Sequence, residues 1–342
     1  MTNLLFTYQI YILLGLISTL IICPYVINTL KKFKARQTLR LEGPSEHKVK
    51  EGTPTMGGIA IFIPIFILSL FFCNFSQEII VLLLTILGFF LVGFIDDILI
   101  VIKGKNDGLR PKLKLVLQML VSGLFGLYLV NTGHGTYLNI PFTSNSIDIS
   151  VFYIPFIIFV MTGTSNAINL TDGLDGLAAG TTAISLLPLI IMLTSNDPMY
   201  IAGMTTGLVC IGTCLGFLWF NSYPASVFMG DTGSLALGGL VSSLAIISHN
   251  ALWLPLAGFI FVIETLSVII QVSYYKRTKK RIFLMSPLHH HFEKKGWRET
   301  KVSFRFYIIA FISSMITISG YLLTSSIPNY LNTTTSIQES VK

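Results

Sequence analysis

Long apolar stretches constrain this chain most, because each is long enough to cross a bilayer as a helix. A crossing takes about 20 apolar residues. Ten such stretches cover residues 8–30, 55–73, 79–95, 115–131, 152–168, 176–194, 199–219, 234–249, 252–275 and 304–326. Since 52% of the residues are hydrophobic and 11% are charged, the whole chain is expected to fold within a membrane.

Helices are the expected form of these stretches, because backbone N–H and C=O groups must find partners inside the lipid. The alternating pattern of a strand barrel is absent from the sequence. The predicted fold is therefore an all-α, polytopic membrane protein with a single domain, 1–342, and about ten transmembrane helices. The first stretch is too long for a cleaved signal peptide and is expected to be retained. The cysteines lie in apolar segments, so neither disulfides nor a CxxC metal site is predicted.

The basic residues predict the orientation. Of the 23 Lys and Arg residues, all but Lys342 fall within 31–50, 103–114 and 276–305, segments separated by even numbers of predicted spans. The positive-inside rule makes that side cytoplasmic, so both termini are expected outside. The predicted cytoplasmic loops are about 31–54, 96–114, 169–175, 220–233 and 276–303. Topology and anionic lipid account for the net charge of +7, which gives no argument for nucleic acid.

Carboxylates from several loops are predicted to share this face. Asp96 and Asp97 end an apolar span, where two adjacent anions repel each other and lose hydration. Such a pair needs a neighbouring cation or must take up a proton. Further carboxylates follow the fifth and seventh spans, which is how a shared site would be built.

The segment Asn166–Gly176 (NAINLTDGLDG) is rich in capping and turn residues. Helix capping by Asn169, Thr171 or Asp172 is the simpler interpretation, but it leaves the further carboxylate and the glycines unexplained. We favour a loop that binds a sugar, ribose or base, with glycines that allow close approach of the backbone. Asn166 and Asn169 would lie on one helix face.

The segment Gly230–Ser234 (GDTGS) precedes an apolar stretch. A helix starting there would present backbone N–H groups to an anion. Asp231 would add an oxygen ligand suited to Mg²⁺. Turns of this composition are common, so the signal gains its strength from the other carboxylates predicted on the same face.

Three consecutive histidines, residues 289–291, lie in the last basic loop. Successive side chains diverge on a helix and alternate on a strand, which disfavours a zinc site. Hydrogen bonding to phosphate, or proton transfer by one imidazole, is favoured instead. Glu264 lies inside a predicted span. A carboxylate there either has a function or forms a hydrogen bond to a neighbouring helix, and we favour the hydrogen bond. Gln271 is expected to point toward the cytoplasmic side.

Five segments together closely resemble the phospho-N-acetylmuramoyl-pentapeptide transferase family: 52–58 (GTPTMGG), 94–97 (FIDD), 169–176 (NLTDGLDG), 228–235 (FMGDTGSL) and 286–293 (SPLHHHFE). The Asp-rich loops are shared by the wider polyprenyl-phosphate N-acetylhexosamine-1-phosphate transferases, whereas the His loop points to the muramoyl-pentapeptide branch. The resemblance implies transfer of phospho-MurNAc-pentapeptide from UDP to undecaprenyl phosphate, giving lipid I and UMP. It also implies a homodimer in the bacterial plasma membrane, with ten spans and a cytoplasmic site.

Carried over by position, the resemblance makes Asp231 the Mg²⁺ ligand. It also implies that Asp231, Asp96, Asp97 and His289 are catalytic residues. The substrate-binding positions, taken from the residues and the resemblance together, are Lys48, Thr53, Lys112, Asn166, Asn169, Asp172, Asp175, Asn221, Gln271, His290 and His291. One departure is Ile100, where many members carry Lys. Either Lys103, one helical turn on, reaches the same phosphate, or that lysine is dispensable.

Two other functions stay open at this point. A secondary transporter would also carry intramembrane polar residues, but its site would lie at the midplane and no inverted repeat is visible. A sister transferase acting on UDP-GlcNAc would share the Asp loops but gives no reason for the His loop. For the transferase, direct attack by the lipid phosphate is favoured over an aspartyl-phosphate intermediate, with Asp96 or Asp97 orienting or deprotonating the nucleophile.

Overall fold

The computed structural model describes residues 2–33, 52–103 and 107–340, with side chains over 7–33, 52–103 and 107–324. Its longer helices are α1 (Thr2–Lys32), α2 (Gly58–Phe72), α3 (Gln77–Lys103), α4 (Pro111–Asn131), α5 (Tyr153–Thr171), α6 (Leu177–Ile191), α7 (Pro198–Asn221), α8 (Gly230–Ile247), α10 (Phe259–Thr278) and α12 (Glu299–Ser340). Two short helices complete the set, α9 (Leu254–Ala257) and α11 (Leu288–Lys294).

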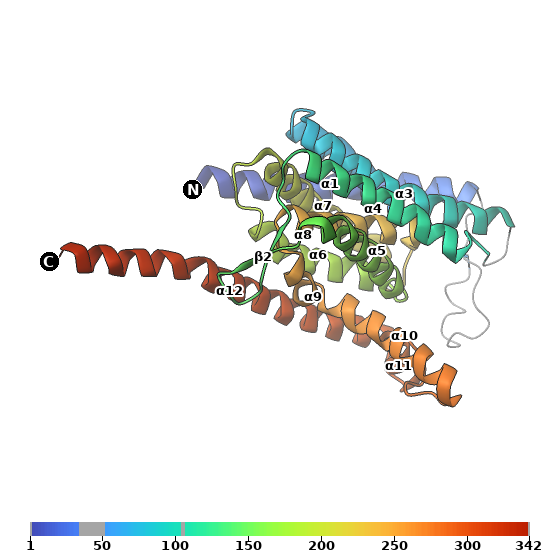
Figure 1. Ribbon diagram of the computed structural model, residues 1–342. Helices are drawn as coiled ribbons and strands as arrows, with labels where there is room; N and C mark the ends of the chain where they lie inside the picture. The colour runs from blue at the N-terminus through green and yellow to red at the C-terminus, as the bar shows by residue number, and fades with distance from the viewer. Residues whose placement is uncertain (1, 34–51, 104–106, 341–342) are drawn as a thin grey trace.

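Within the described ranges, eight helices are long and apolar enough to cross a membrane. Two further apolar helices, α2 and α6, have 15 residues each and coincide with the second and sixth predicted spans. The predicted polytopic helical fold is therefore confirmed, while the count of ten spans stays a prediction. Figure 1 shows that α1 begins and α12 ends at the same end of the bundle.

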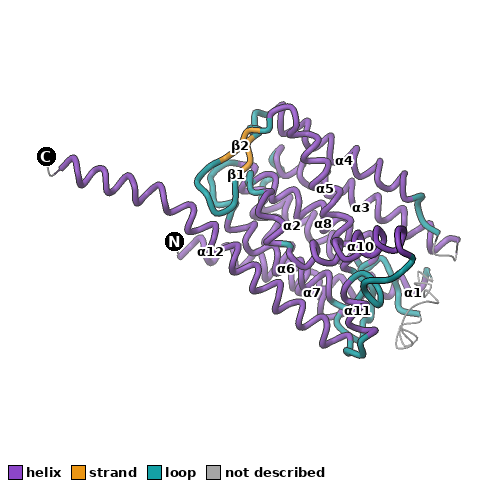
Figure 2. Tube along the Cα trace, turned by 60° about the horizontal axis from the view of Figure 1, so that its bottom comes forward, coloured by secondary structure: helices purple, strands orange, loops and turns teal. Residues whose placement is uncertain are grey.

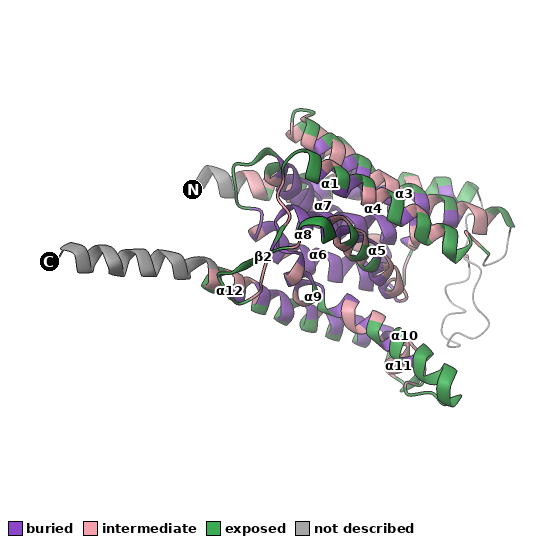
Figure 3. Ribbon diagram, in the orientation of Figure 1, coloured by how far each residue is buried: buried purple, intermediate pink, exposed green. Residues whose placement is uncertain are grey.

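Helices α7 and α8 form the centre of the bundle. The apolar window of α8 is 89% buried and that of α7 is 78% buried, whereas α4 is 28% buried. In Figure 3 the buried residues accordingly concentrate in the middle and the exposed ones on the outer helices. Small residues allow this close packing. A Cβ on Gly93 of α3 would lie 2.0 Å from the carbonyl oxygen of Asp231, so α3 touches the start of α8 directly.

Several helix ends differ from the prediction; α12, for example, continues to Ser340 instead of ending near residue 326. The loop predicted from residue 96 is wrong at its start, because α3 continues to Lys103 through an apolar run, residues 98–102. Asp96 and Asp97 therefore lie within a helix. The predicted stretch 252–275 is broken at Gly258, which separates α9 from α10.

A short antiparallel hairpin was not predicted. Strands β1 (Tyr137–Asn139) and β2 (Ser146–Asp148) pair with Leu138 opposite Ile147. With three residues each, the strands are too short to show a pattern in the sequence. The hairpin lies at the opposite end of the bundle from α11 (Figures 1 and 2).

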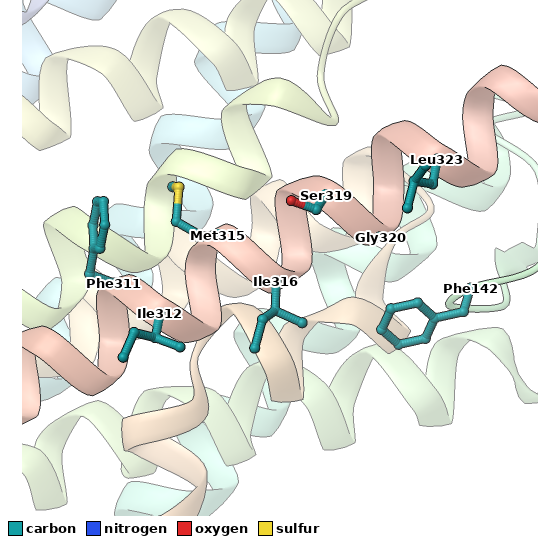
Figure 4. Close-up of a pocket in the computed structure, with 8 residues that line it drawn as sticks. All are labelled: Phe142, Phe311, Ile312, Met315, Ile316, Ser319, Gly320 and Leu323. Carbon is teal, nitrogen blue, oxygen red and sulfur yellow. The ribbon is translucent and has the colours of Figure 1, made fainter.

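An apolar groove of about 480 Å³ runs along α12 between Phe311 and Leu323, where Phe142 from the hairpin turn closes it (Figure 4). Ser319 is the one side chain with a polar oxygen in its lining. The groove shares no residue with the carboxylates described next.

Candidate active site

Four helices bring polar side chains together at the end of the bundle where α3 ends and α4 and α8 begin. Asp231 lies in the first turn of α8, and its carboxylate forms an ion pair with the ammonium of Lys114, from the first turn of α4. The same ammonium lies 3.7 Å from Asp96 Oδ2. Asn169, in the last turn of α5, donates from Nδ2 to Asp231 Oδ1 at 2.7 Å.

Asp97 accepts hydrogen bonds from the start of α8. Its Oδ1 accepts from the backbone N–H of Asp231 at 3.2 Å. Its Oδ2 accepts from the backbone N–H of Thr232 at 2.9 Å and from the Thr232 hydroxyl at 2.6 Å. The first N–H groups of a helix have no partner within it, and an anion there also interacts favourably with the helix dipole. Asp97 is 4% exposed and anchors α8 to α3.

Asp96 holds the start of the next helix and also faces the cation. Its Oδ1 accepts from the backbone N–H of Leu109 at 2.7 Å, while Oδ2 faces Lys114. The two oxygens of Asp96 thus serve different partners, whereas both oxygens of Asp97 are bound to α8.

Asp172 directly follows α5 and lies near the other carboxylates. Burial raises the pKa of this carboxyl well above its ordinary value, and the charges of Asp231, Asp97 and Asp175 raise it further. A hydrogen bond from the backbone of Gly230 partly opposes the rise in pKa. Among the described residues one cation, Lys114, contacts these carboxylates. The negative charge of the site therefore exceeds its positive charge.

Asp175 and Asn221 tie two loops together. Asp175 Oδ2 accepts from Ala225 N at 3.0 Å. Asn221 Oδ1 accepts from Gly176 N at 3.1 Å, and its Nδ2 donates to Val227 O at 2.8 Å. Both residues hold the turn after α5 against the segment that leads into α8.

Gln271 and His291 organise the loop between α10 and α11. Gln271 Oε1 accepts from the backbone N–H groups of Ile282 and Phe283, both at 3.0 Å, and Nε2 donates to Phe283 O at 3.0 Å. His291 Nδ1 accepts from Leu284 N at 3.0 Å. Burial, and then the charge of Lys295, lower the pKa of His291, which favours this neutral, accepting form.

The three histidines have separate partners. His290 Nδ1 lies 2.7 Å from Glu293 Oε2, and His289 Nδ1 lies 3.1 Å from Glu264 Oε2. No group of three or more His, Cys, Asp or Glu side chains within the described ranges could hold a metal ion. Glu264 has the hydrogen bond to a neighbouring helix that the sequence favoured.

Other predicted positions lie apart from the carboxylates or carry no contact with them. Asn166 donates to Gln118 Oε1 at 2.7 Å and to Thr162 O at 2.8 Å, deeper along α5. Thr53 is partly exposed, beside a segment in which Pro54 O accepts from Phe228 N at 2.8 Å. Lys48 lies outside the described residues.

Lys114 was missed by the sequence interpretation, which chose Lys112. In the structure Lys112 is exposed. A usable signal was present: Gln118 and Ser122 follow Lys114 at i+4 spacing and are buried, so the three form one polar stripe on an apolar helix. Lys103 is also exposed and donates to Asp107 O at 2.9 Å.

The donor set at Asp231 and Asp96 suits Mg²⁺. This ion takes one or two protein carboxylates and fills its other positions with water and substrate phosphates. The two carboxylates already face a shared cation, the ammonium of Lys114. A small number of protein ligands is thus what the chemistry of this ion requires.

Comparison with known proteins identifies the family. The model of glycosyl transferase family 4 matches residues 79–249, and signature 1 of the phospho-N-acetylmuramoyl-pentapeptide-transferases matches residues 50–62. The phospho-N-acetylmuramoyl-pentapeptide-transferase of Halalkalibacterium halodurans is 47% identical over 90% of this chain and 95% of its own length. The protein of that name from Staphylococcus haemolyticus is 48% identical over 89% and 96%, and that from Thermodesulfovibrio yellowstonii 45% over 92% of each. The chain belongs to the phospho-N-acetylmuramoyl-pentapeptide-transferase family.

Proposed function

We propose that this protein transfers phospho-MurNAc-pentapeptide from UDP-MurNAc-pentapeptide to undecaprenyl phosphate, forming lipid I and UMP. The observation that carries the proposal is the set of carboxylates around Lys114 at one end of a membrane helix bundle, in a chain of this family. Family membership supports this choice of substrates, and the site offers the charges that a transfer between two phosphates needs.

The reaction exchanges one phosphoanhydride bond for another, so charge neutralisation and alignment matter more than covalent help. An oxygen of the lipid phosphate attacks the β-phosphorus, and the bond to the α-phosphate oxygen breaks to release UMP. Bound Mg²⁺, held by Asp231 with Asp96, would neutralise the diphosphate and the leaving group. Lys114 adds positive charge at the same point.

The nucleophile needs little activation, because a phosphate ester with a second pKa of about 6 is largely dianionic at neutral pH. Among the paired carboxylates, Asp96 is the better candidate to orient it or to accept a residual proton. Its Oδ2 faces Lys114, whereas both oxygens of Asp97 are bound to α8. Direct attack therefore remains the favoured route over an aspartyl-phosphate intermediate.

A cytoplasmic site is part of the proposal. The exposed cations at the end of α10 lie at the same end of the bundle as α11 (Figure 1), and the positive-inside rule favours the cytoplasm for that end. UDP-linked substrates are soluble, so a site on this side could reach them. A homodimer in the plasma membrane is the assembly that we propose from the family resemblance.

The test is UMP release by purified protein in detergent with undecaprenyl phosphate, Mg²⁺ and either UDP-MurNAc-pentapeptide or UDP-GlcNAc. We expect release with the first nucleotide, and its loss in Asp231→Asn and after Mg²⁺ is removed by a chelator. Release with UDP-GlcNAc instead would assign the protein to the sister transferases. No release with either from folded protein would refute the proposal and return a transporter to consideration.

A further inference from the structure

A buried Glu–His pair lies between α10 and α11. Glu264 and His289 are each 0% exposed. Glu264 Oε1 accepts from the backbone N–H of His289 at 3.2 Å, and Oε2 lies 3.1 Å from Nδ1 of the same residue. Both oxygens of Glu264 thus contact His289, one at its backbone and one at its ring, and together these contacts fix the orientation of the ring.

The other ring nitrogen faces the turn that follows α5. His289 Nε2 is buried and has no hydrogen-bond partner. A Cβ on Gly173 would lie 2.2 Å from Nε2 and 2.8 Å from Cε1. The imidazole therefore packs directly on the backbone of Gly173, and only glycine fits there while the ring keeps its place.

The turn that His289 supports is residues 172–176, and it is held from other sides as well. Asp175 N donates to Glu299 Oε1 at 2.6 Å, at the start of α12. Leu174 is buried in an apolar cluster against which Leu288 of α11 packs. At its beginning the turn carries Asp172, whose carboxyl interacts with the backbone of Gly230 and with the charge of Asp231.

We propose that Glu264 and His289 are positioning residues: the pair holds the 172–176 turn so that Asp172 stays beside Gly230 and Asp231. Neither side chain touches substrate. This assignment differs from the catalytic role that the family resemblance implies for His289, because its ring is fully buried and its free nitrogen meets backbone. The kinetic consequence rests on the proposed function, but the structural consequence does not.

Hydrogen exchange of the full-length protein in detergent tests the structural part. Glu264→Gln and His289→Ala should each speed exchange in the backbone amides of 169–177 by about tenfold, the effect of losing one buried hydrogen-bonded contact. The double variant should show no more than the larger single effect, because the two residues act as one unit. Glu293→Gln is the matched control: it alters the neighbouring Glu–His contact of α11 and should leave this turn unchanged.

Gly173→Ala adds a steric test. The new methyl group collides with Nε2, so the single variant should lose most of its activity, and combining it with His289→Ala should recover part of that loss. A histidine that acts on the substrate itself could not be rescued in this way. Failure of the second substitution to improve Gly173→Ala would count against the packing argument.

Steady-state kinetics separates positioning from catalysis. In Glu264→Gln the KM for the UDP-linked substrate should rise about tenfold with a smaller fall in kcat and an unchanged KM for undecaprenyl phosphate. A fall in kcat alone would overturn the proposal, and so would unchanged exchange of the turn in both Glu264→Gln and His289→Ala. If the wild-type protein releases no UMP, the proposed function fails, and the exchange experiment still decides the positioning role.

Discussion

Asp97→Asn tests whether this carboxylate is an anchor for α8. The two oxygens of Asp97 accept three hydrogen bonds, from the backbone N–H groups of Asp231 and Thr232 and from the Thr232 hydroxyl. An asparagine keeps one oxygen acceptor and turns its NH₂ group toward at least one of these donors. It also removes the negative charge at the start of the helix.

The expected cost follows from these contacts. A hydrogen bond to a charged group contributes about 1.5–3 kcal/mol, and an anion at a helix start contributes up to about 2 kcal/mol in partly buried sites. Because one acceptor remains, we expect Asp97→Asn to lower the free energy of unfolding by roughly 2–4 kcal/mol. Asp96→Asn is the matched control: it retains an acceptor for Leu109 and should cost about 1 kcal/mol.

Stability is measured by reversible unfolding in mixed detergent micelles with increasing dodecyl sulfate. Activity is measured separately, as UMP release without denaturant, where each variant is folded. We expect Asp97→Asn to lose both stability and activity, and Asp96→Asn to lose chiefly activity. The reasoning is refuted if Asp97→Asn is as stable as Asp96→Asn, since the three contacts to α8 would then contribute nothing particular.

Three further outcomes are expected. Lys114→Met should abolish UMP release and lower stability by roughly 2 kcal/mol through uncompensated carboxylates, and Mg²⁺ should restore part of the stability in an unfolding titration. Gly93→Ala should cost about 1–3 kcal/mol by overpacking α3 on α8, whereas Gly123→Ala, whose Cβ would have its nearest neighbour at 3.5 Å, should be nearly neutral in the same measurement. Burial, and then the charge of His134, lower the pKa of His249 to about 4. Between about pH 6.5 and 4 the unfolded chain therefore binds a proton that the folded protein does not bind. Unfolding followed against pH should show stability falling by up to about 3 kcal/mol over that range, and His249→Gln should remove this component.

The helices could be predicted because hydropathy over a long window needs no knowledge of packing. Their ends could not, since an apolar run such as 98–102 can continue a helix past the point where charged residues suggest that a loop begins. For the same reason the predicted loop began at residue 96, at the Asp96–Asp97 pair, and not after Lys103. The hairpin at 137–148 depends on contacts with other segments at its end of the bundle, including the hydrogen bond from Asn139 N to His249 O at 2.9 Å.

Convergence of Asp96, Asp97 and Asp231 could be predicted by counting spans, because that count alone places loops on one side. The choice between Lys112 and Lys114 could not be made in that way. Two residues apart on a helix means about 200° of rotation, so the packing of α4 decides which lysine meets the carboxylates. The polar stripe that Lys114 forms with Gln118 and Ser122 indicates which lysine faces the carboxylates. That conclusion requires knowing that α4 turns its polar stripe toward the bundle.

Roles of polar side chains were the hardest to predict, because binding a nucleoside and tying down a loop require the same chemical groups. Asn221 and Gln271 use both ends of their amides on backbone groups. Both amides are therefore engaged in holding loops in this structure. A nucleotide could contact only their remaining donor or acceptor positions unless these bonds are exchanged.

Charge balance links the carboxylates to the proposed chemistry. Asp96 and Asp231 face the ammonium of Lys114, and Asp97 binds the start of α8 beside them. Burial, and then the charges of Asp231, Asp97 and Asp175, raise the pKa of Asp172. A nucleotide diphosphate would bring further negative charge into this region, where partial burial strengthens repulsion. The approach of such a substrate is therefore unfavourable unless positive charge accompanies it. If Mg²⁺ binds at Asp231 and Asp96 as proposed, its charge would offset this repulsion, and the cluster would favour the magnesium complex over the free nucleotide.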